Sequence, residues 1–312
     1  MKKLTKMYLL LAAMMTIALA FALLSGSMAP AEMYPTSFTA PSTWGAHMQS
    51  HFDYTVQEDD SALLLHYSGP AGNIVIPNEL DGHPIMAVRG NPFADCRDEY
   101  TLSVSRSHPY LATINGVLFG KSDRKLICYP VSGTAPSYAI PDGIEIIGDE
   151  AFYGCEQLVA VTIPESVTRI GNQAFSDCEN LVSITIPEGV TDIGNGAFDR
   201  CGRLTNVAIP GSVTGIGDRA FADCDQLVSV TIPEGVTGIG SEAFYGCNAL
   251  YSVAIPDSVV QIGPGAFDNC PYLTVNVTPG SYAERYCQDY GLRYTACTDL
   301  GDATEWLTGT AD

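Results

Sequence analysis

Residues 186–210 read IPEGVTDIGNGAFDRCGRLTNVAIP, and the same pattern returns along the chain at a fixed interval. Three of its positions, the Phe of an Ala-Phe pair, the Cys after it and the Pro that ends each copy, recur every 23 residues. They recur at Phe152, Phe175, Phe198, Phe221, Phe244 and Phe267, at Cys155, Cys178, Cys201, Cys224, Cys247 and Cys270, and at Pro141, Pro164, Pro187, Pro210, Pro233, Pro256 and Pro279. Three registers that agree over six copies predict a repeat solenoid.

Within one copy, the pattern predicts a short strand and a turn. Leu181, Ile184 and Ile186 point to one face of a strand, and Pro187 ends it because proline cannot donate to a β-ladder. Gly194 is expected to permit a tight bend, and the pair Ala197-Phe198 to turn inward as a helical turn. Since one coil cannot bury its own apolar side, stacking of successive coils forms the core.

The repeat resembles the leucine-rich repeats of the BspA-like family of bacterial and protist surface proteins, over about residues 52–296. The segments INGVLF (114–119) and KLICYP (125–130) resemble the hairpin that often interrupts these arrays, and GSYAERY (280–286) resembles their closing helix. The resemblance implies a leucine-rich-repeat solenoid of mainly short β-strands with helical turns, an inserted β-hairpin and a C-terminal helical cap. It also implies adhesion, to which characterised members are linked.

The first residues predict export. Lys2, Lys3 and Lys6 precede an uncharged apolar run over 7–24, and Ala29-Pro30-Ala31 offers a cleavage site. The run is also just long enough to span a bilayer, so an uncleaved anchor is the alternative. We therefore expect a secreted or cell-surface protein that meets a membrane only through this segment.

The remaining boundaries follow from where the period holds and fails. We expect a signal peptide or anchor (1–31), a flexible leader (32–50), an N-terminal hairpin and first irregular coil (51–100), a strand plus inserted hairpin (101–135), regular repeats (136–280), a C-terminal cap (281–298) and an acidic tail (299–312). The first coil is expected to carry an extra loop at 80–84.

The cysteines are interpreted as structural. Equivalent residues of stacked coils have parallel Cα–Cβ vectors, which disfavours both a disulfide and convergence on one zinc ion. The histidines all precede the regular repeats, so no ladder cysteine has a histidine nearby in its coil to act as a base. We predict a buried thiol ladder of Cys96, Cys155, Cys178, Cys201, Cys224, Cys247 and Cys270. The redox state of Cys128, Cys287 and Cys297 stays open, and a Cys287–Cys297 disulfide is one possibility.

Function is expected on the exposed positions that vary between coils. The outward strand residues, such as Ser183, Thr185 and Asn206, are small and uncharged. Aromatic and charged side chains beside the Ala-Phe turns and in the hairpin are the candidate interaction surface. They are Phe119, Arg124, Tyr129, Tyr138, Tyr153, Arg200 and Tyr245, to which Tyr251 is added at the margin of the outward strand face.

Composition excludes several functions. The chain carries 35 acidic against 15 basic side chains, which disfavours nucleic acid as a partner. Phosphate-binding loops and the common hydrolase and metalloprotease motifs are absent from the sequence, so we expect no enzyme activity, cofactor, metal or small-molecule substrate. We expect a monomeric interaction module for an extracellular protein or glycan. The alternative is a structural spacer or envelope scaffold with no specific ligand.

Overall fold

The computed structural model describes residues 47–49, 51–96, 98–131 and 135–297. The expected signal segment, the leader except for 47–49, and the acidic tail lie outside the described residues. Within the described part, no helix is long and apolar enough to cross a membrane.

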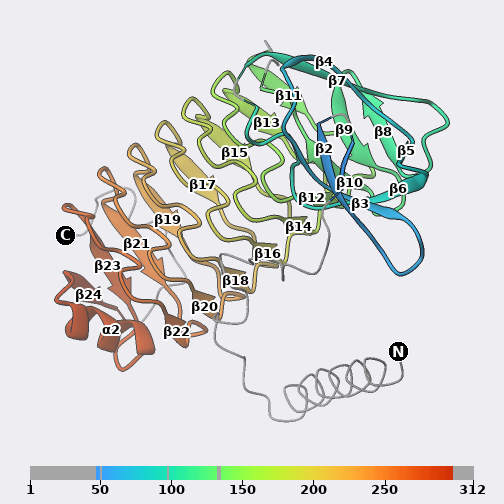
Figure 1. The fold of residues 1–312 in the computed structure, drawn as a ribbon. Helices are drawn as coiled ribbons and strands as arrows, with labels where there is room; N and C mark the ends of the chain where they lie inside the picture. The colour runs from blue at the N-terminus through green and yellow to red at the C-terminus, as the bar shows by residue number, and fades with distance from the viewer. Residues whose placement is uncertain (1–46, 50, 97, 132–134, 298–312) are drawn as a thin grey trace, which may run out of the picture. The chain divides into compact units, whose positions relative to one another are not determined.

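The regular repeats stack as coils, each of which adds one strand to a parallel sheet (Figure 1). In β15 the side chain of Ile184 is buried, while Ser183 and Thr185 on either side of it are exposed. Neighbouring strands pair one period apart, as in the register of Ser183 with Asn206. The sheet contains β11 (Ser137–Ala139), β13 (Ala160–Thr162), β15 (Ser183–Thr185), β17 (Asn206–Ala208), β19 (Ser229–Thr231), β21 (Ser252–Ile255), β23 (Thr274–Val277) and β24 (Tyr294–Ala296).

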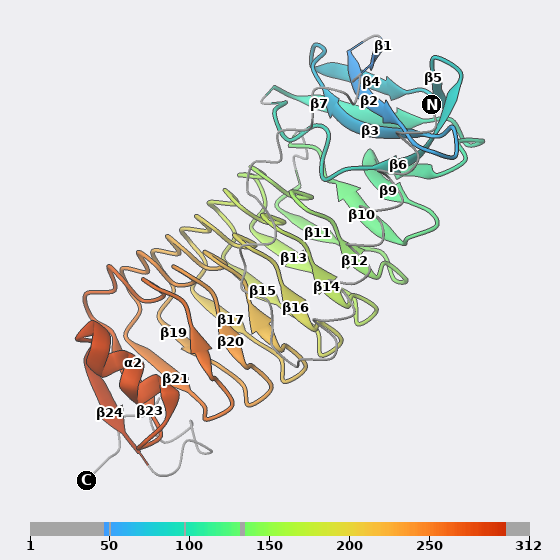
Figure 2. The ribbon, with the colours of Figure 1, turned by 60° about the horizontal axis from the view of Figure 1, so that its bottom comes forward.

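A second sheet runs beside the first and consists mainly of two-residue strands (Figure 2). Its repeated strands have an exposed or half-buried residue followed by an apolar one, as in Asp192 and the buried Ile193. Strands this short carry no alternation by which a sequence could reveal them. In sheet order they are β22 (Gln261–Ile262), β20 (Gly238–Ile239), β18 (Gly215–Ile216), β16 (Asp192–Ile193), β14 (Arg169–Ile170), β12 (Ile146–Ile147), β10 (Lys125–Cys128), β9 (Val117–Gly120) and β8 (Leu111–Ile114).

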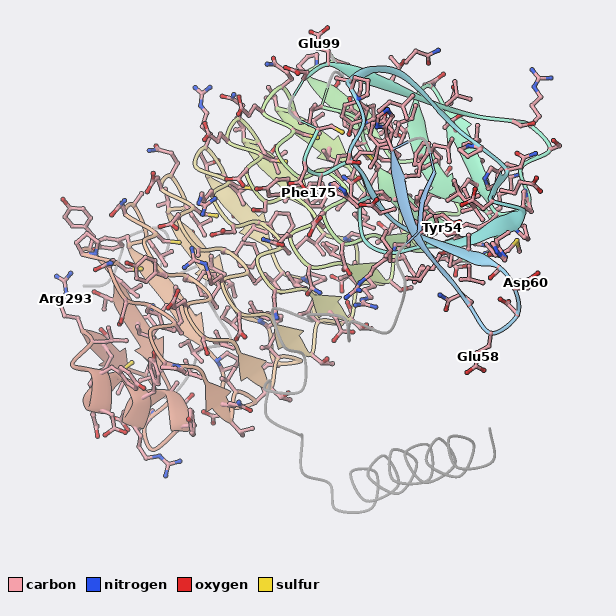
Figure 3. All side chains as sticks on the ribbon, in the orientation of Figure 1. Tyr54, Glu58, Asp60, Glu99, Phe175 and Arg293 are labelled. Carbon is pink, nitrogen blue, oxygen red and sulfur yellow. The ribbon has the colours of Figure 1, made fainter. Side chains whose placement is uncertain are left out.

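The N-terminal part of the described chain has its own core. Strands β2 and β3 form an antiparallel hairpin, and the segment expected as an extra loop at 80–84 forms the turn and flanks of a β5–β6 hairpin. The buried aromatic side chains of Phe52, Tyr67, Phe93 and Tyr100 pack one against the next. The strands are β1 (His47–Gln49), β2 (Phe52–Val56), β3 (Ala62–Tyr67), β4 (Gly72–Ile76), β5 (Glu79–Leu80), β6 (His83–Val88) and β7 (Tyr100–Val104). In Figure 3, Glu58 and Asp60 lie in the turn between β2 and β3.

The helical turn expected at the Ala-Phe pairs is not formed, which corrects that prediction. The backbone N–H groups of Gly196, Phe198 and Arg200 donate to carbonyl oxygens of the next coil, at 2.7–2.8 Å. Those of Ala197, Asp199 and Cys201 donate three residues back, and Gly196 and Arg200 have positive φ. Because alternate N–H groups serve the neighbouring coil, the segment is a run of turns.

A column of phenylalanine rings forms the centre of the array. The six repeated rings stack with centroids 4.8–5.4 Å apart and interplanar angles of 10° or less. Tyr129 continues the column before Phe152, at 5.2 Å, and Tyr286 closes it edge-on beyond Phe267, at 6.4 Å. The array therefore advances, from one coil to the next, by about the distance between two stacked rings.

The repeated glycines allow this close stacking. Gly194 does not have the positive φ that a glycine-specific bend requires, so the expected reason for it was wrong. A Cβ there would lie 2.6 Å from the backbone carbon of Gly171 in the preceding coil. The equivalent contacts at Gly171, Gly217, Gly240 and Gly263 are 2.4–2.6 Å from a backbone atom.

We therefore expect Gly217→Val to lower the free energy of unfolding by about 3 kcal/mol, because the side chain forces two coil backbones apart. Urea unfolding followed by circular dichroism measures the loss. Gly202→Val is the matched control, since no atom lies within 4 Å of a Cβ built there. Equal stabilities of the two variants would contradict this role of the glycine column.

Helix α2 (Tyr282–Tyr290) follows the last coil, within the segment 281–298 expected to form the C-terminal cap. The Ser281 hydroxyl accepts the Glu284 backbone N–H, and Gly291 ends the helix in the left-handed conformation. The helix buries Ala283, Tyr286 and Cys287 against the end of the array. Strand β24 then pairs with β23 and extends the first sheet, which begins at β11.

Candidate functional site

The repeated thiols face the core and donate hydrogen bonds. Cys178, Cys201, Cys224 and Cys247 are fully buried. Each Sγ donates to the carbonyl oxygen of the phenylalanine 26 residues earlier, as from Cys201 to Phe175 at 3.1 Å. The same carbonyl of Phe175 also accepts the backbone N–H of Cys178. Cysteine therefore supplies both a small apolar side chain and a donor to the coil before it.

Burial keeps these thiols protonated. It raises the pKa of Cys128 and Cys178 to about 12. At Cys201, burial and the neighbouring thiols Cys178 and Cys224 together raise the pKa well above its usual value. A nucleophilic cysteine needs a lowered pKa. The buried thiols are thus unsuited to nucleophilic catalysis.

The ends of the thiol column are more open. Cys96 and Cys270 are half-buried, and all ten cysteines of the described chain are free. The considered Cys287–Cys297 disulfide is therefore not formed: Cys287 lies on the buried face of helix α2, and Cys297 is half-buried after β24.

Cys96 differs from the expectation that no ladder cysteine has a histidine nearby. Cys96 does have a histidine nearby, because His66 and Cys96 line the same cavity of about 370 Å³. Both ring nitrogens of His66 lie near carboxylates, at 3.4 Å from Asp53 and 3.2 Å from Asp95. Burial also raises the pKa of Cys96. The arrangement lacks the free imidazole nitrogen that an activated thiol requires.

Three of the predicted interaction residues belong to the core instead of the surface. Phe119 and Tyr129 are buried, and Tyr138 is half-buried with its ring 4.8 Å from that of Tyr129. Tyr129 stands 23 residues before Phe152, so the period itself indicates its place in the ring column. Strands β9 and β10 thus cover the end of the array, and deleting them would expose the core.

The other predicted residues lie at the surface. Arg124 is exposed and pairs with Glu145. Tyr251 is 66% exposed beside the strand face, the outward side of the first sheet with side chains such as Ser183 and Asn206. Tyr153 and Tyr245 are half-buried beside the turns, and Arg200 is exposed. Tyr153, Arg200 and Tyr245, which lie beside the Ala-Phe segments, therefore share one edge of the array. Arg124 lies apart from them, in the turn between β9 and β10.

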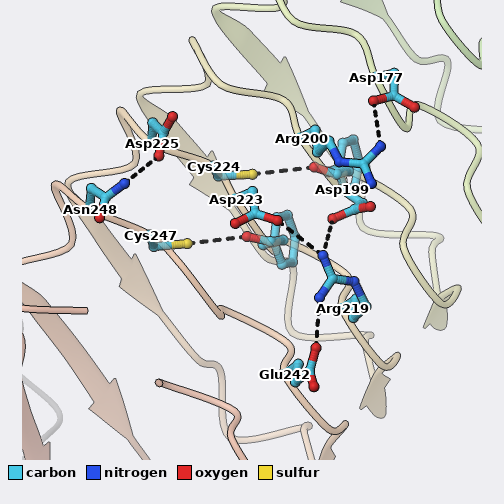
Figure 4. Close-up of polar contacts among 12 residues, drawn as sticks. Asp177, Asp199, Arg200, Arg219, Asp223, Cys224, Asp225, Glu242, Cys247 and Asn248 are labelled. Atoms are coloured by element: carbon cyan, nitrogen blue, oxygen red, sulfur yellow. Dashed lines mark hydrogen bonds and ion pairs between the residues drawn. The ribbon is translucent and has the colours of Figure 1, made fainter. Parts of the chain in front are cut away.

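Ion pairs join the coils along this edge (Figure 4). Arg200 pairs with Asp177 at 2.9 Å. Arg219 pairs with Asp199 and Asp223 at 3.0 Å and with Glu242 at 2.6 Å. Burial raises the pKa of the Asp199 carboxyl, and the guanidinium of Arg219 opposes that shift. Sequence reasoning missed Arg219, although its 23-residue separation from Glu242 is the spacing at which stacked side chains meet.

An open groove follows the same edge, between the cysteine turns and the strand face. It consists of two cavities, of about 800 and 640 Å³, that share Asp223; we call them together the edge groove. The first is lined by Glu179, Asn180, Val182, Arg200, Gly202, Arg203, Thr205, Asp223, Asp225 and Gln226. The second is lined by Asp223, Tyr245, Gly246, Asn248, Phe267, Asp268, Asn269, Cys270, Pro271 and Leu292.

Hydrogen bonds between coils hold polar side chains of the edge groove in place. Arg203 Nη1 donates to Asn180 Oδ1 at 3.1 Å, and Asn180 Nδ2 donates to the carbonyl of Glu156 at 2.8 Å. Asn248 Nδ2 donates to Asp225 Oδ1 at 2.6 Å (Figure 4). The groove therefore presents an ordered row of donors and acceptors, a feature that the sequence analysis did not identify.

Comparison with known families identifies the repeat. The profile of the BspA type leucine rich repeat region matches residues 135–281, in six copies. No curated protein sequence matches the chain significantly.

Two solved structures have a similar fold. The pneumococcal vaccine antigen PcpA has a TM-score of 0.56 at 16% identity, and the match covers 75% of this chain and 59% of PcpA. A leucine-rich repeat protein from Eubacterium ventriosum has a TM-score of 0.51 at 23% identity, and the match covers 66% of this chain and 63% of that one. The Treponema pallidum leucine rich repeat protein is 26% identical, with a TM-score of 0.46, and the match covers 81% of this chain and all of that one.

Proposed function

Since this chain is a leucine-rich repeat protein of the BspA type, a type of bacterial surface protein, we propose that it is a non-enzymatic binding module of the adhesion type. It acts at the cell surface or after secretion, and its partner is an extracellular protein or glycan. The expected N-terminal export segment supports this location.

The edge groove is the observation that carries the proposal. Inside the array the same residue types recur in every coil, because packing fixes them. Along the groove they differ from coil to coil: Asn180, Arg203 and Gln226 occupy equivalent positions. Variation on a rigid scaffold is where a specific surface is built.

The chemistry of the buried groups supports binding without catalysis. The interior thiols are protonated and hydrogen-bonded, and the most connected charges of the edge, around Arg219, neutralise one another. The groove is open and exposes both polar and apolar atoms, which suits recognition of another surface better than enclosure of a reacting substrate.

A spacer without a ligand is the competing function, and the flat strand face favours it. Its outward side chains, such as Ser183, Asn206 and Thr231, are small and uncharged. Such a face has none of the aromatic or arginine anchors that dominate interfaces. Binding experiments separate the two functions because a spacer binds nothing specifically.

To test the proposal, the labelled full chain is applied to immobilised extracellular-matrix proteins and to glycan arrays. We expect specific binding, weakened about tenfold or more in an Arg203→Ala/Asn248→Ala variant. The matched control, Asn206→Ala/Thr231→Ala, alters the strand face of neighbouring coils and should bind like the unmodified chain. Absence of binding to every probe would favour the spacer and overturn the proposal.

A further inference from the structure

We propose that the edge groove binds an extended, neutral β-1,4-linked glycan that lies along the solenoid axis with one sugar facing each coil. The inference rests on the proposed binding function and specifies its ligand class. It follows from the spacing of the coils, the side chains of the groove and their charge.

The spacing of the coils favours a glycan over a peptide. Phe198 and Phe221 are 5.1 Å apart, and Phe221 and Phe244 are 5.3 Å apart, so equivalent groups recur along the axis at about this interval. An extended peptide advances by only about 3.3 Å per residue and falls out of register after one coil. An extended β-1,4-linked glycan advances by close to one coil per sugar, so each sugar meets an equivalent position.

The side chains at the equivalent positions suit sugar hydroxyls. Asn180, Arg203 and Gln226 are planar groups one period apart, and the amides supply both donors and acceptors. A hydroxyl group donates and accepts in the same way. Every coil from Cys178 to Cys224 thus offers a hydrogen-bonding group to a polymer with hydroxyls on every unit.

The groove is also ordered before a ligand arrives. The hydrogen bonds from Arg203 to Asn180 and from Asn248 to Asp225 tie each side chain to the preceding coil. Immobilising a free side chain on binding costs free energy, and this cost is reduced where the side chain is already held.

The charged side chains of the edge groove favour a neutral polymer over a polyanion. The arginines and carboxylates of the first cavity nearly balance, and Arg200 is already paired with Asp177. Asp223 likewise pairs with Arg219, whose guanidinium lies 5.7 Å from the Tyr245 ring centroid. The acidic chain around the groove repels polyanions such as sulfated glycans.

Isothermal titration of the full chain with cellohexaose and chitohexaose tests the inference, with the α-1,4-linked maltohexaose as control. We expect binding of at least one β-linked hexasaccharide, affinity that rises from disaccharide to hexasaccharide, and weaker or no binding of maltohexaose. Equal affinity for maltohexaose, or no dependence on length, would overturn the inference.

Two variants of one coil place the site. Arg203→Ala is expected to weaken binding about tenfold, whereas Asn206→Ala, three residues away on the strand face, leaves it unchanged. Both side chains are exposed, so circular dichroism should show both variants folded. If Arg203→Ala binds like the unmodified chain, the groove assignment is wrong. If the chain binds matrix proteins but no β-1,4-glycan, the inference fails while the proposed function stands.

Discussion

Raising the pH above about 9 is expected to destabilise the chain steeply, because the buried thiols cannot release their protons while it is folded. An unfolded thiol titrates near 9, whereas burial raises the pKa of Cys178 to about 12. Above pH 9 the unfolded chain therefore binds fewer protons than the folded one. The stability that the neutral thiols contribute is fully present below that pH. The free energy of unfolding then falls as the pH rises toward the pKa of the thiols in the folded chain.

The size of this effect follows from the number of thiols. Each thiol that is neutral in the folded chain and ionised in the unfolded chain removes about 1.4 kcal/mol per pH unit. The pKa is raised, chiefly by burial, at Cys128, Cys155, Cys178, Cys201 and Cys224. A domain is typically stable by about 5–15 kcal/mol, so one to two pH units should unfold this one. Urea unfolding under reducing conditions at a series of pH values measures the slope.

Cys224→Ser is the matched control for the thiol prediction. The hydroxyl keeps a donor toward the carbonyl oxygen of Phe198, 3.3 Å from Sγ, but it does not titrate in this range. Its slope should be shallower by about 1.4 kcal/mol per pH unit, while the buried tyrosines contribute equally in both chains. Identical slopes would show that Cys224 ionises in the folded chain.

Phe198→Ala is expected to lower the free energy of unfolding by about 3–5 kcal/mol. The ring is fully buried in the middle of the column, with Phe175 at 5.2 Å on one side and Phe221 at 5.1 Å on the other. Truncation leaves a cavity between two stacked neighbours and weakens the coupling between coils on which a solenoid depends.

Urea unfolding measures this loss, with Thr185→Ala on the exposed strand face as control. The control should change stability by less than about 0.5 kcal/mol, since it removes only exposed atoms. We also expect Phe198→Ala to make unfolding less cooperative, with the coils on either side melting separately. A loss below about 1 kcal/mol would contradict the central role of the ring column.

The interior of the array could be predicted from the sequence because its determinants are periodic. The 23-residue recurrence of Phe, Cys and Pro identified the stacked coils, and the alternation around Ile184 identified the strands. The same period also indicated Tyr129 as the first ring of the column. Tyr129 was nevertheless predicted at the surface, because the residues around it do not match the repeat.

What the sequence did not reveal depends on contacts between coils. The Ala-Phe segment has a local pattern compatible with a helical turn, but N–H groups such as that of Phe198 donate to the next coil. The edge groove arises from pairs such as Asn180 and Arg203, which no local pattern connects. Pairing charged and polar residues one period apart would have found both this contact and the one between Asp177 and Arg200.

Photo-crosslinking tests most directly whether the edge groove, and not the strand face, is the binding surface. Benzoylphenylalanine replaces either Gln226, in the groove, or Thr231, on the strand face of the same coil; both side chains are exposed. The full chains are incubated with a glycan or matrix surface that they bind, and are then irradiated. The account predicts adducts from position 226 and none above background from position 231. Adducts from position 231 alone would contradict it.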